Sequence, residues 1–240
     1  MDKEYFSKRI KELSNEIGIL LKEEQIEKFY IYMQLLIDWN EKVNLTAIVE
    51  PEEIILKHFI DSITIAKNID KNTKLIDVGT GAGFPGIPLK IIREDIDVCL
   101  LDSLNKRINF LNEVVSKLKL NKIEAIHGRA EELGRNKKYR EKFDYATSRA
   151  VANLATLSEY LMPFIKENGY CISMKGNSIE EELEQGKKAI SILGGEVREI
   201  QRFQLPQSDI NRCVVMINKV KTTPAKYPRK SGTPAKEPIK

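Results

Sequence analysis

The sequence predicts an α/β protein with a mostly parallel sheet that has an antiparallel strand at its end, and with a helical region before the sheet. After residue 70, short apolar runs alternate with helical segments, and this alternation is typical of βαβ units with a parallel sheet. Near the C-terminus, two apolar runs at 194–205 and 211–220 are separated by a short loop. A parallel pair needs a long crossover, so these two runs are expected to be antiparallel neighbours.

The chain before the sheet is expected to form three helices. Apolar residues recur at spacings of three and four along 6–17 and again along 26–37. Pro51, followed by two acids, suits the first turn of a third helix. We therefore expect a helical region, a sheet-containing domain and a tail, at 1–68, 69–220 and 221–240.

The middle of the chain supplies the parallel strands and their crossover helices. The strands are expected at 74–79, 97–102, 122–128, 143–150 and 169–176. The helices are expected near 86–93, 105–118, 152–165 and 178–192. The segment from residue 221 has four prolines and no apolar periodicity, so its composition predicts a flexible tail.

The charge of the chain is concentrated at its end. Residues 219–240 contain seven Lys or Arg and one acid, which gives them a charge of +6. The whole chain has a net charge of +4, so residues 1–218 together carry −2. This distribution is expected for contact with a polyanion. No apolar run approaches the ~20 residues of a membrane span, and we expect a cytoplasmic protein without membrane contact.

Neither the cysteines nor the histidines form a metal-binding pattern. The three cysteines have no ligand spacing, and each lies in an apolar, strand-like run, so we expect buried, unreactive side chains. The two histidines are too few and too far apart for a zinc site. We expect no metal.

Residues 75–88, L-I-D-V-G-T-G-A-G-F-P-G-I-P, predict a ligand-binding turn between a strand and a helix. Glycine permits positive φ and leaves room for a ligand against the backbone, while the helix that follows offers free N–H groups to an anion. Gly79, Gly81 and Gly83 match the spacing of S-adenosylmethionine (SAM) sites, but Gly81, Gly83 and Gly86 also match the dinucleotide pattern. The turn alone does not distinguish the two cofactors.

Two acids are expected near this turn. Asp102 ends the second strand, where a carboxylate can accept both ribose hydroxyls of an adenosine; its alternative role is a helix N-cap. After the third strand, the amide of Ala130 or the carboxylate of Glu131 could hold the adenine, or Glu131 could be a first-turn acid. The C-terminal hairpin, and the lack of an obvious proton donor for hydride transfer, favour SAM over a nicotinamide cofactor.

The chain resembles the bacterial RsmG methyltransferases, also called glucose-inhibited division protein B. The resemblance covers nearly the whole chain and rests on five motifs in order: W-N-E-K-V-N-L-T at 39–46, H-F-I-D-S at 58–62, D-V-G-T-G-A-G-F-P-G at 77–86, S-R-A at 148–150 and Y-P-R-K-S-G-T-P at 227–234. It implies a class I SAM-dependent methyltransferase fold, Rossmann-like, with SAM as cofactor. It also implies methylation of N7 of one guanosine in 16S ribosomal RNA.

The resemblance also implies the residues of the cofactor site. Family positions for SAM contact carry over to Gly79, Phe84, Asp102, Ser103, Leu104, Ala130, Glu131 and Arg149. N7 of guanine carries a lone pair and no proton, so its methylation needs no general base and we expect no catalytic acid or base. Ser148 and Arg149 are expected to position the base or the methionine carboxylate.

RNA contact is expected from the N-terminal region and from the tail, at Asn40, Lys42, Asn44, His58, Lys226, Arg229, Lys230 and Lys236. The partner would be 16S rRNA or the small ribosomal subunit particle, and we expect a monomer. Three alternatives remain open: a SAM enzyme acting on a small molecule or protein, a nicotinamide-dependent oxidoreductase, and an RNA-binding module with a vestigial pocket.

Overall fold

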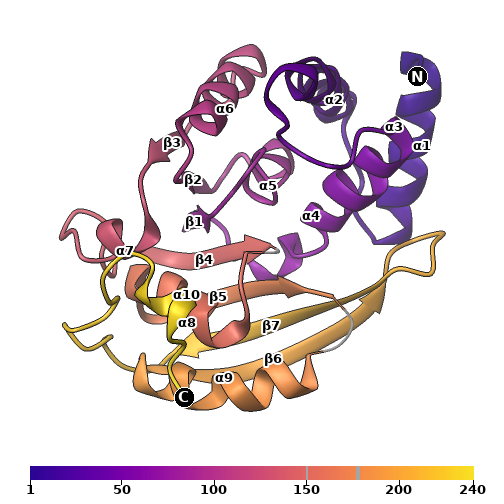
Figure 1. Ribbon diagram of the computed structural model, residues 1–240. Helices are drawn as coiled ribbons and strands as arrows, with labels where there is room; N and C mark the ends of the chain where they lie inside the picture. The colour runs from indigo at the N-terminus through magenta and orange to yellow at the C-terminus, as the bar shows by residue number, and fades with distance from the viewer. Residues whose placement is uncertain (150, 177–178) are drawn as a thin grey trace.

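The computed structural model describes residues 1–149, 151–176 and 179–240, and it contains one seven-stranded sheet (Figure 1). The strand order is β3-β2-β1-β4-β5-β7-β6. The strands are β1 Lys74–Val78, β2 Asp97–Asp102, β3 Ile123–His127, β4 Phe143–Arg149, β5 Ile165–Lys175, β6 Gly195–Gln204 and β7 Asn211–Lys219.

Strand direction agrees with the sequence-based expectation. The pairs β1–β2, β1–β4, β2–β3 and β4–β5 are parallel, whereas β7 is antiparallel to both β5 and β6. The predicted hairpin is therefore confirmed. The antiparallel strand is the last in the chain, but it lies one strand inside the sheet because β6 forms the edge.

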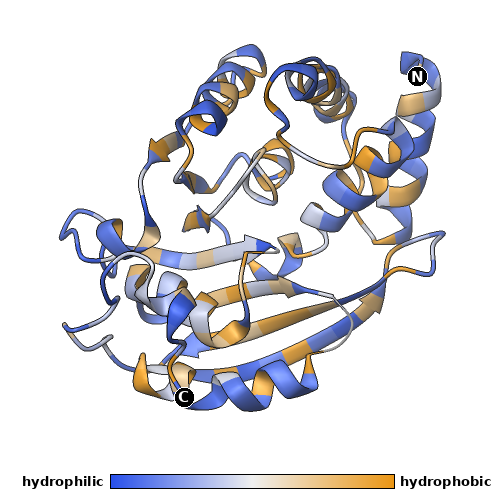
Figure 2. Ribbon diagram, in the orientation of Figure 1, coloured by the Kyte–Doolittle hydropathy of each residue, from blue (hydrophilic) through white to orange (hydrophobic). Residues whose placement is uncertain are grey.

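Helices cover both faces of the sheet, and the strands alternate between two hydrophobic cores. Leu75 packs in the core with α1 Lys3–Glu16, α2 Glu23–Val43 and α6 Asn105–Lys117, while its neighbour Ile76 packs in the core with α8 Leu154–Leu161 and α9 Glu180–Ile192. Successive strand residues point to opposite faces, so two layers form. Figure 2 shows hydrophobic and hydrophilic residues together on α1, α2 and α9, as expected for helices with one buried side.

The remaining elements are short. They are α3 Pro51–Glu53, the π-helix η1 Ile54–Ile60, α4 Asp61–Ile63, the 3₁₀ helices η2 Ala66–Asn68 and η3 Met162–Phe164, α5 Gly86–Ile92, α7 Ala130–Leu133 and α10 Thr233–Lys236. The predicted third helix is thus divided by a π segment. The helix expected at 152–165 starts at Leu154, after the N-cap Asn153, and tightens to 3₁₀ geometry at Met162.

The C-terminal segment 221–240 packs on the sheet domain, which differs from the flexible tail that its composition predicts. Glu159 of α8 is fully buried and accepts hydrogen bonds from the backbone N–H of Arg229 (2.7 Å) and from its guanidinium Nη2 (2.7 Å). Buried Lys219, the last residue of β7, donates to the carbonyls of Met162 and Ile165 and also to Thr223 Oγ1 (2.7 Å) of this segment. Tyr227 and Ile239 of the segment are also buried in the core that contains α8 and α9. Composition could not foresee this order, because it depends on a few single residues and their partners far away in the chain.

Within the described ranges, no helix has both the length and the apolar character that crossing a bilayer requires.

Replacing Arg229 with Ala should destabilise the fold by about 3 kcal/mol, because a buried carboxylate would lose its charge partner. Urea unfolding would measure this. Lys230→Ala is the matched control: its exposed neighbouring side chain should change stability by less than about 0.5 kcal/mol. Equal effects of the two changes would show that the Glu159–Arg229 pair does not hold the segment.

Candidate functional site

A cavity of about 920 Å³ opens at the carboxyl ends of the parallel strands. Its wall includes Val78 at the end of β1, Asp102 at the end of β2, Arg149 at the end of β4 and Lys175 at the end of β5. Between β1 and β4 the strand order reverses direction, and in α/β sheets this switch point is where ligands bind.

The glycine turn forms the floor of the cavity. Gly79 and Gly81 have φ of +70° and +63°, which other residues rarely adopt, and both line the cavity. Gly86 has a different role: a Cβ there would lie 2.4 Å from Leu100 Cδ2 and 2.9 Å from Asp77 Oδ2. Packing therefore explains the third glycine of the dinucleotide pattern, and a bound dinucleotide is not needed to account for it.

Asp77 braces the same turn from below. Its fully buried carboxylate accepts from Thr80 Oγ1 (2.6 Å) and from the Gly86 N–H (2.8 Å), both on Oδ2. Burial raises the pKa of Asp77 to about 6. Among the described residues its Oδ1 has no hydrogen-bond partner.

Asp102 ties the second strand to the turn. It is 2% exposed, accepts from the Gly81 N–H (2.9 Å) and the Leu104 N–H (2.9 Å), and lies 3.2 Å from Arg107 Nη1. The alternative role as helix N-cap is wrong, because α6 begins at Asn105 and Leu104 is its N-cap residue. Ser103 follows on the cavity wall.

The loop after β3 meets the C-terminal segment at the cavity wall. Ala130 and Glu131 both line the cavity, and Glu131 Oε1 accepts from the Gly232 N–H at 2.8 Å. Gly232 and Ala235 also line it. The carboxylate expected to hold an adenine is thus also the attachment point of the C-terminal segment, a role that the sequence did not suggest.

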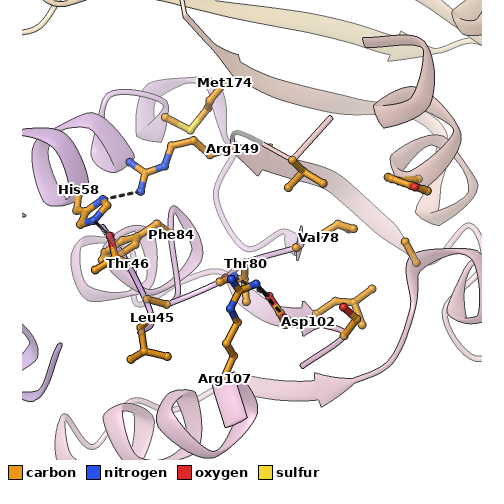
Figure 3. A pocket seen from close by; sticks show the side chains of 18 of the residues that line it. Leu45, Thr46, His58, Val78, Thr80, Phe84, Asp102, Arg107, Arg149 and Met174 are labelled. Carbon is orange, nitrogen blue, oxygen red and sulfur yellow. Dashed lines mark hydrogen bonds and ion pairs between the residues drawn. The ribbon is translucent and has the colours of Figure 1, made fainter. Parts of the chain in front are cut away.

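Arg149 organises the opposite side of the cavity (Figure 3). Its Nη1 donates to the Lys57 carbonyl (2.8 Å) and to Asp61 Oδ2 (3.1 Å), and its Nη2 donates to His58 Nδ1 (3.0 Å). The guanidinium also lies 5.1 Å from the centre of the Phe84 ring, which stacks on the His58 ring at 4.3 Å. Arg149 thereby joins the N-terminal region to the sheet.

The π-helix η1 makes these contacts possible. The N–H of Asp61 bonds the carbonyls of Leu56 and His58 instead of that of Lys57, its partner in a regular α-helix. The Lys57 carbonyl accepts from Arg149. Sequence periodicity predicted a helix here but could not predict its π geometry.

His58 is a neutral imidazole with a defined tautomer. Burial, and then the positive charge of Arg149, lower the pKa of His58 to about 3. An arginine can only donate, so Nδ1 accepts and Nε2 carries the hydrogen. Nε2 lies 3.0 Å from Thr46 Oγ1 and donates to it. The side chain is 7% exposed and lines the cavity, so its predicted RNA contact would have to occur inside the cavity.

The structure does not bring Ser148 to the cavity. Its hydroxyl is fully buried and donates to the Val78 carbonyl at 2.8 Å. Ser148 therefore cannot position a substrate, and this part of the prediction is wrong. Ala150, the last residue of the S-R-A motif, lies outside the described residues.

The other RNA-contact candidates lie outside the cavity wall. Asn40 Oδ1 accepts from the Thr46 N–H (2.8 Å), and Asn44 closes α2 with φ of +46°, so both shape the turn that follows α2. Lys42 is exposed, as are Lys226, Lys230 and Lys236 of the C-terminal segment. Arg229 is held by Glu159.

The sequence suggested Asp61 as a candidate for RNA contact but did not predict its ion pairs. Asp61 accepts from Arg149 and also from Arg212 Nε (3.0 Å), so one buried carboxylate pairs with two guanidiniums. Thr46 was missed. Both residues lie in motifs that the resemblance singled out, at 58–62 and 39–46, and that was the available clue.

The cysteines are buried, as expected. Burial raises the pKa of Cys99 and Cys171 to about 12, and that of Cys213 is also raised, so thiolates are scarce at neutral pH. The cavity wall, as far as the structure describes it, contains no cysteine. In the same described ranges no cluster of His, Cys, Asp and Glu is suited to a metal ion.

Comparisons with known proteins identify close relatives. The family described as rRNA small subunit methyltransferase G matches residues 25–211. A protein of Acetivibrio thermocellus named ribosomal RNA small subunit methyltransferase G is 57% identical over 223 residues, which are 92% of each chain. A protein of Desulforamulus reducens with the same name is 54% identical over 232 residues, 96% of this chain and 97% of its own.

Solved structures support the fold. The M. jannaschii TYW2 protein in complex with AdoMet is similar with a TM-score of 0.52 and 15% identity, covering 67% of this chain and 75% of that one. The [4+2]-cyclase SpnF is similar with a TM-score of 0.53 and 11% identity, covering 68% and 82%. A cyclase with this fold shows that the fold alone does not define the reaction.

Acid should destabilise this chain partly through His58. In the unfolded chain His58 binds a proton once the pH falls below its ordinary pKa near 6.5, whereas in the folded chain its pKa is about 3. The unfolded chain therefore binds more protons between these two pH values, and stability falls as the pH drops through this range. From pH 7 to pH 5 the loss should exceed that of a His58→Gln variant by about 2 kcal/mol, measured by urea unfolding. Asp77 titrates in both proteins and cancels in the difference. Equal losses would mean that His58 titrates normally.

Proposed function

The chain belongs to the rRNA small subunit methyltransferase G family, and on this basis we propose that it transfers a methyl group from SAM to N7 of one guanosine in 16S ribosomal RNA. The observation that carries the proposal is the 57% identity to a relative of that name over 92% of both chains. The target atom is the one that the sequence resemblance implies.

The cavity supports SAM as the cofactor. Its two ends differ in charge: the carboxylate of Asp102 lies on one side of the glycine turn and the guanidinium of Arg149 on the other (Figure 3). SAM has a ribose diol at one end, which suits a carboxylate, and a carboxylate at the other, which suits a guanidinium. We propose that Gly79, Gly81, Gly83, Phe84, Asp102, Ser103, Leu104, Ala130, Glu131 and Arg149 form the cofactor site.

The residues of this chain would act by alignment. When bound, SAM supplies a methyl group on a positively charged sulfur. N7 of guanine has a lone pair and no proton, so no side chain must accept one. Holding the two reactants in line can lower the barrier by ~7–11 kcal/mol. Neutral His58, fixed by Arg149, supports such a role because it stays uncharged and immobile across the physiological pH range.

The RNA is proposed to approach over the exposed lysines near the cavity. The C-terminal segment borders the cavity through Gly232 and Ala235, so Lys230 and Lys236 lie beside its rim. Phosphate contacts by such lysines give affinity and position without selecting a sequence. We propose that the enzyme acts in the cytoplasm, on 16S rRNA or the small ribosomal subunit particle, and as a monomer.

Two experiments decide between this function and the alternatives. Calorimetry should show binding of SAM and none of NAD, and Asp102→Ala should weaken SAM by about 1–3 kcal/mol because charged hydrogen bonds are lost. Asp209→Ala, an exposed residue in the β6–β7 loop, is the charge-matched control and should leave SAM affinity unchanged. Tight NAD binding without SAM binding would contradict the proposal.

Mass mapping of 16S rRNA from cells with and without the gene should reveal one N7-methylguanosine that depends on the enzyme. A SAM-binding protein whose loss leaves rRNA modification unchanged would instead act on a small molecule or protein.

The lysines of the C-terminal segment should contribute to RNA affinity but not to SAM affinity. Changing Lys230 and Lys236 to Ala should remove about two phosphate contacts and reduce the slope of log affinity against log salt by roughly one to two. Exposed Lys8 and Lys71, near the start of α1 and before β1, provide a double variant of equal charge that should keep the full slope. Identical slopes for both variants would place the RNA surface elsewhere.

A further inference from the structure

Thr46 occupies a fixed position on the cavity wall. It follows α2, and its backbone N–H is held by Asn40 Oδ1 at 2.8 Å. Its side chain lines the cavity beside His58 and Phe84 (Figure 3). The cofactor and RNA contacts considered above do not use this hydroxyl.

The hydrogen bonds around Thr46 run in one direction only. Arg149 donates to His58 Nδ1, so Nε2 of the neutral ring must carry the hydrogen and donate to Thr46 Oγ1. If the hydrogen of the ring were on Nδ1 instead, the N–H of His58 would point at an N–H of Arg149 only 3.0 Å away, and the contact would be repulsive. Asp61 and the Lys57 carbonyl hold Arg149 in place, and Arg149 is the first donor in this series of hydrogen bonds.

Toward a ligand in the cavity, the hydroxyl of Thr46 can therefore act only as a donor. Oγ1 accepts from His58 Nε2 (3.0 Å) and also from the Ile48 N–H (3.1 Å). A hydroxyl oxygen has two lone pairs and one hydrogen, so both acceptor positions are taken. Its own hydrogen is left for a group in the cavity, and that group must be an acceptor.

Guanine presents such an acceptor next to N7. Its major-groove edge carries N7 and O6, both acceptors, whereas adenine carries an N6 amino group where guanine has O6. Resting on the function proposed above, we propose that the Thr46 hydroxyl donates to O6 of the target guanine and so determines specificity for guanine over adenine. His58 and Arg149 are positioning residues in this arrangement, because they fix the direction in which Thr46 donates.

A neutral donor suits this position better than the cations of the wall. Methylation at N7 places a positive charge on the purine, and a lysine or guanidinium against O6 would oppose it. Five of the six lysines and arginines that line the cavity are also engaged with carboxylates, the exception in the described residues being exposed Arg129: Lys57 pairs with Glu53, Arg107 with Asp102, Arg149 and Arg212 with Asp61, and Lys175 with Glu182. Thr46 offers a hydrogen without a charge.

The test compares purines at the target position found by mass mapping. RNA carrying 2-aminopurine there keeps N7 and the 2-amino group but lacks O6, whereas inosine keeps both N7 and O6. The unchanged enzyme should methylate inosine nearly as well as guanosine, and 2-aminopurine with kcat/KM lower by about 10- to 100-fold, since a buried donor loses its acceptor. This comparison also serves as the control for the proposed function. No transfer to guanosine N7 by the unchanged enzyme would overturn that function and, with it, the assignment of Thr46.

The variants Thr46→Val and Thr46→Ser separate recognition from packing. Thr46→Val has nearly the same shape without a hydroxyl, so its guanosine rate should fall and its ratio of guanosine to 2-aminopurine should fall by about 10-fold or more. Thr46→Ser keeps the hydroxyl and should keep the ratio. Both should bind SAM within about two-fold of the unchanged protein, and thermal melts would identify any loss of folding.

Two results would overturn the assignment. An unchanged ratio in folded Thr46→Val would mean that the hydroxyl does not contact O6. A loss of SAM affinity in Thr46→Val equal to its loss of kcat/KM would mean that the hydroxyl serves the cofactor.

Discussion

The arrangement of the site depends on the guanidinium of Arg149, at the end of a central strand. Burial lowers the pKa of Arg149, and the carboxylate of Asp61 opposes this effect. The cost of burying the charge is offset because Asp61, the Lys57 carbonyl and His58 each accept one of its hydrogen bonds. All three acceptors come from the N-terminal region, so the same charge that needs them also fixes that region against the ligand edge of the sheet.

Two segments outside the parallel sheet complete the cavity, and carboxylates attach both. Asp61 connects the N-terminal region to β4 and to Arg212 of β7. Glu131 and Glu159 connect the C-terminal segment to α7 and α8. Each carboxylate is nearly or fully buried, so it needs its partners: guanidiniums for Asp61 and Glu159, and the Gly232 N–H for Glu131.

The sequence predicted those residues of the site whose position follows from the residues next to them in the chain. The glycine turn and Asp102 each follow a strand directly, and the end of a parallel strand has a known position relative to the sheet edge. Ser148 was misplaced for a related reason: it precedes Arg149 in a strand, and successive strand residues point to opposite sides, so only one of the two could face the cavity. The contacts of Arg149 join positions about 90 residues apart, and no local pattern in a single sequence encodes such pairings.

Residues 219–240 offer fewer cations to RNA than their sequence indicates. Lys219 is fully buried, and burial lowers its pKa to about 8 while nearby Glu141 opposes the shift. Arg229 is paired with Glu159. Two of the seven cations between 219 and 240 thus hold the fold together, and they cannot also neutralise phosphates without exposing buried partners. Five lysines remain exposed, so the segment offers five cations instead of seven for phosphate contacts: Lys221, Lys226, Lys230, Lys236 and Lys240. Phosphate contacts do not select a sequence, so discrimination among nucleotides must come from inside the cavity, where the hydrogen-bond direction at Thr46 is fixed by the fold.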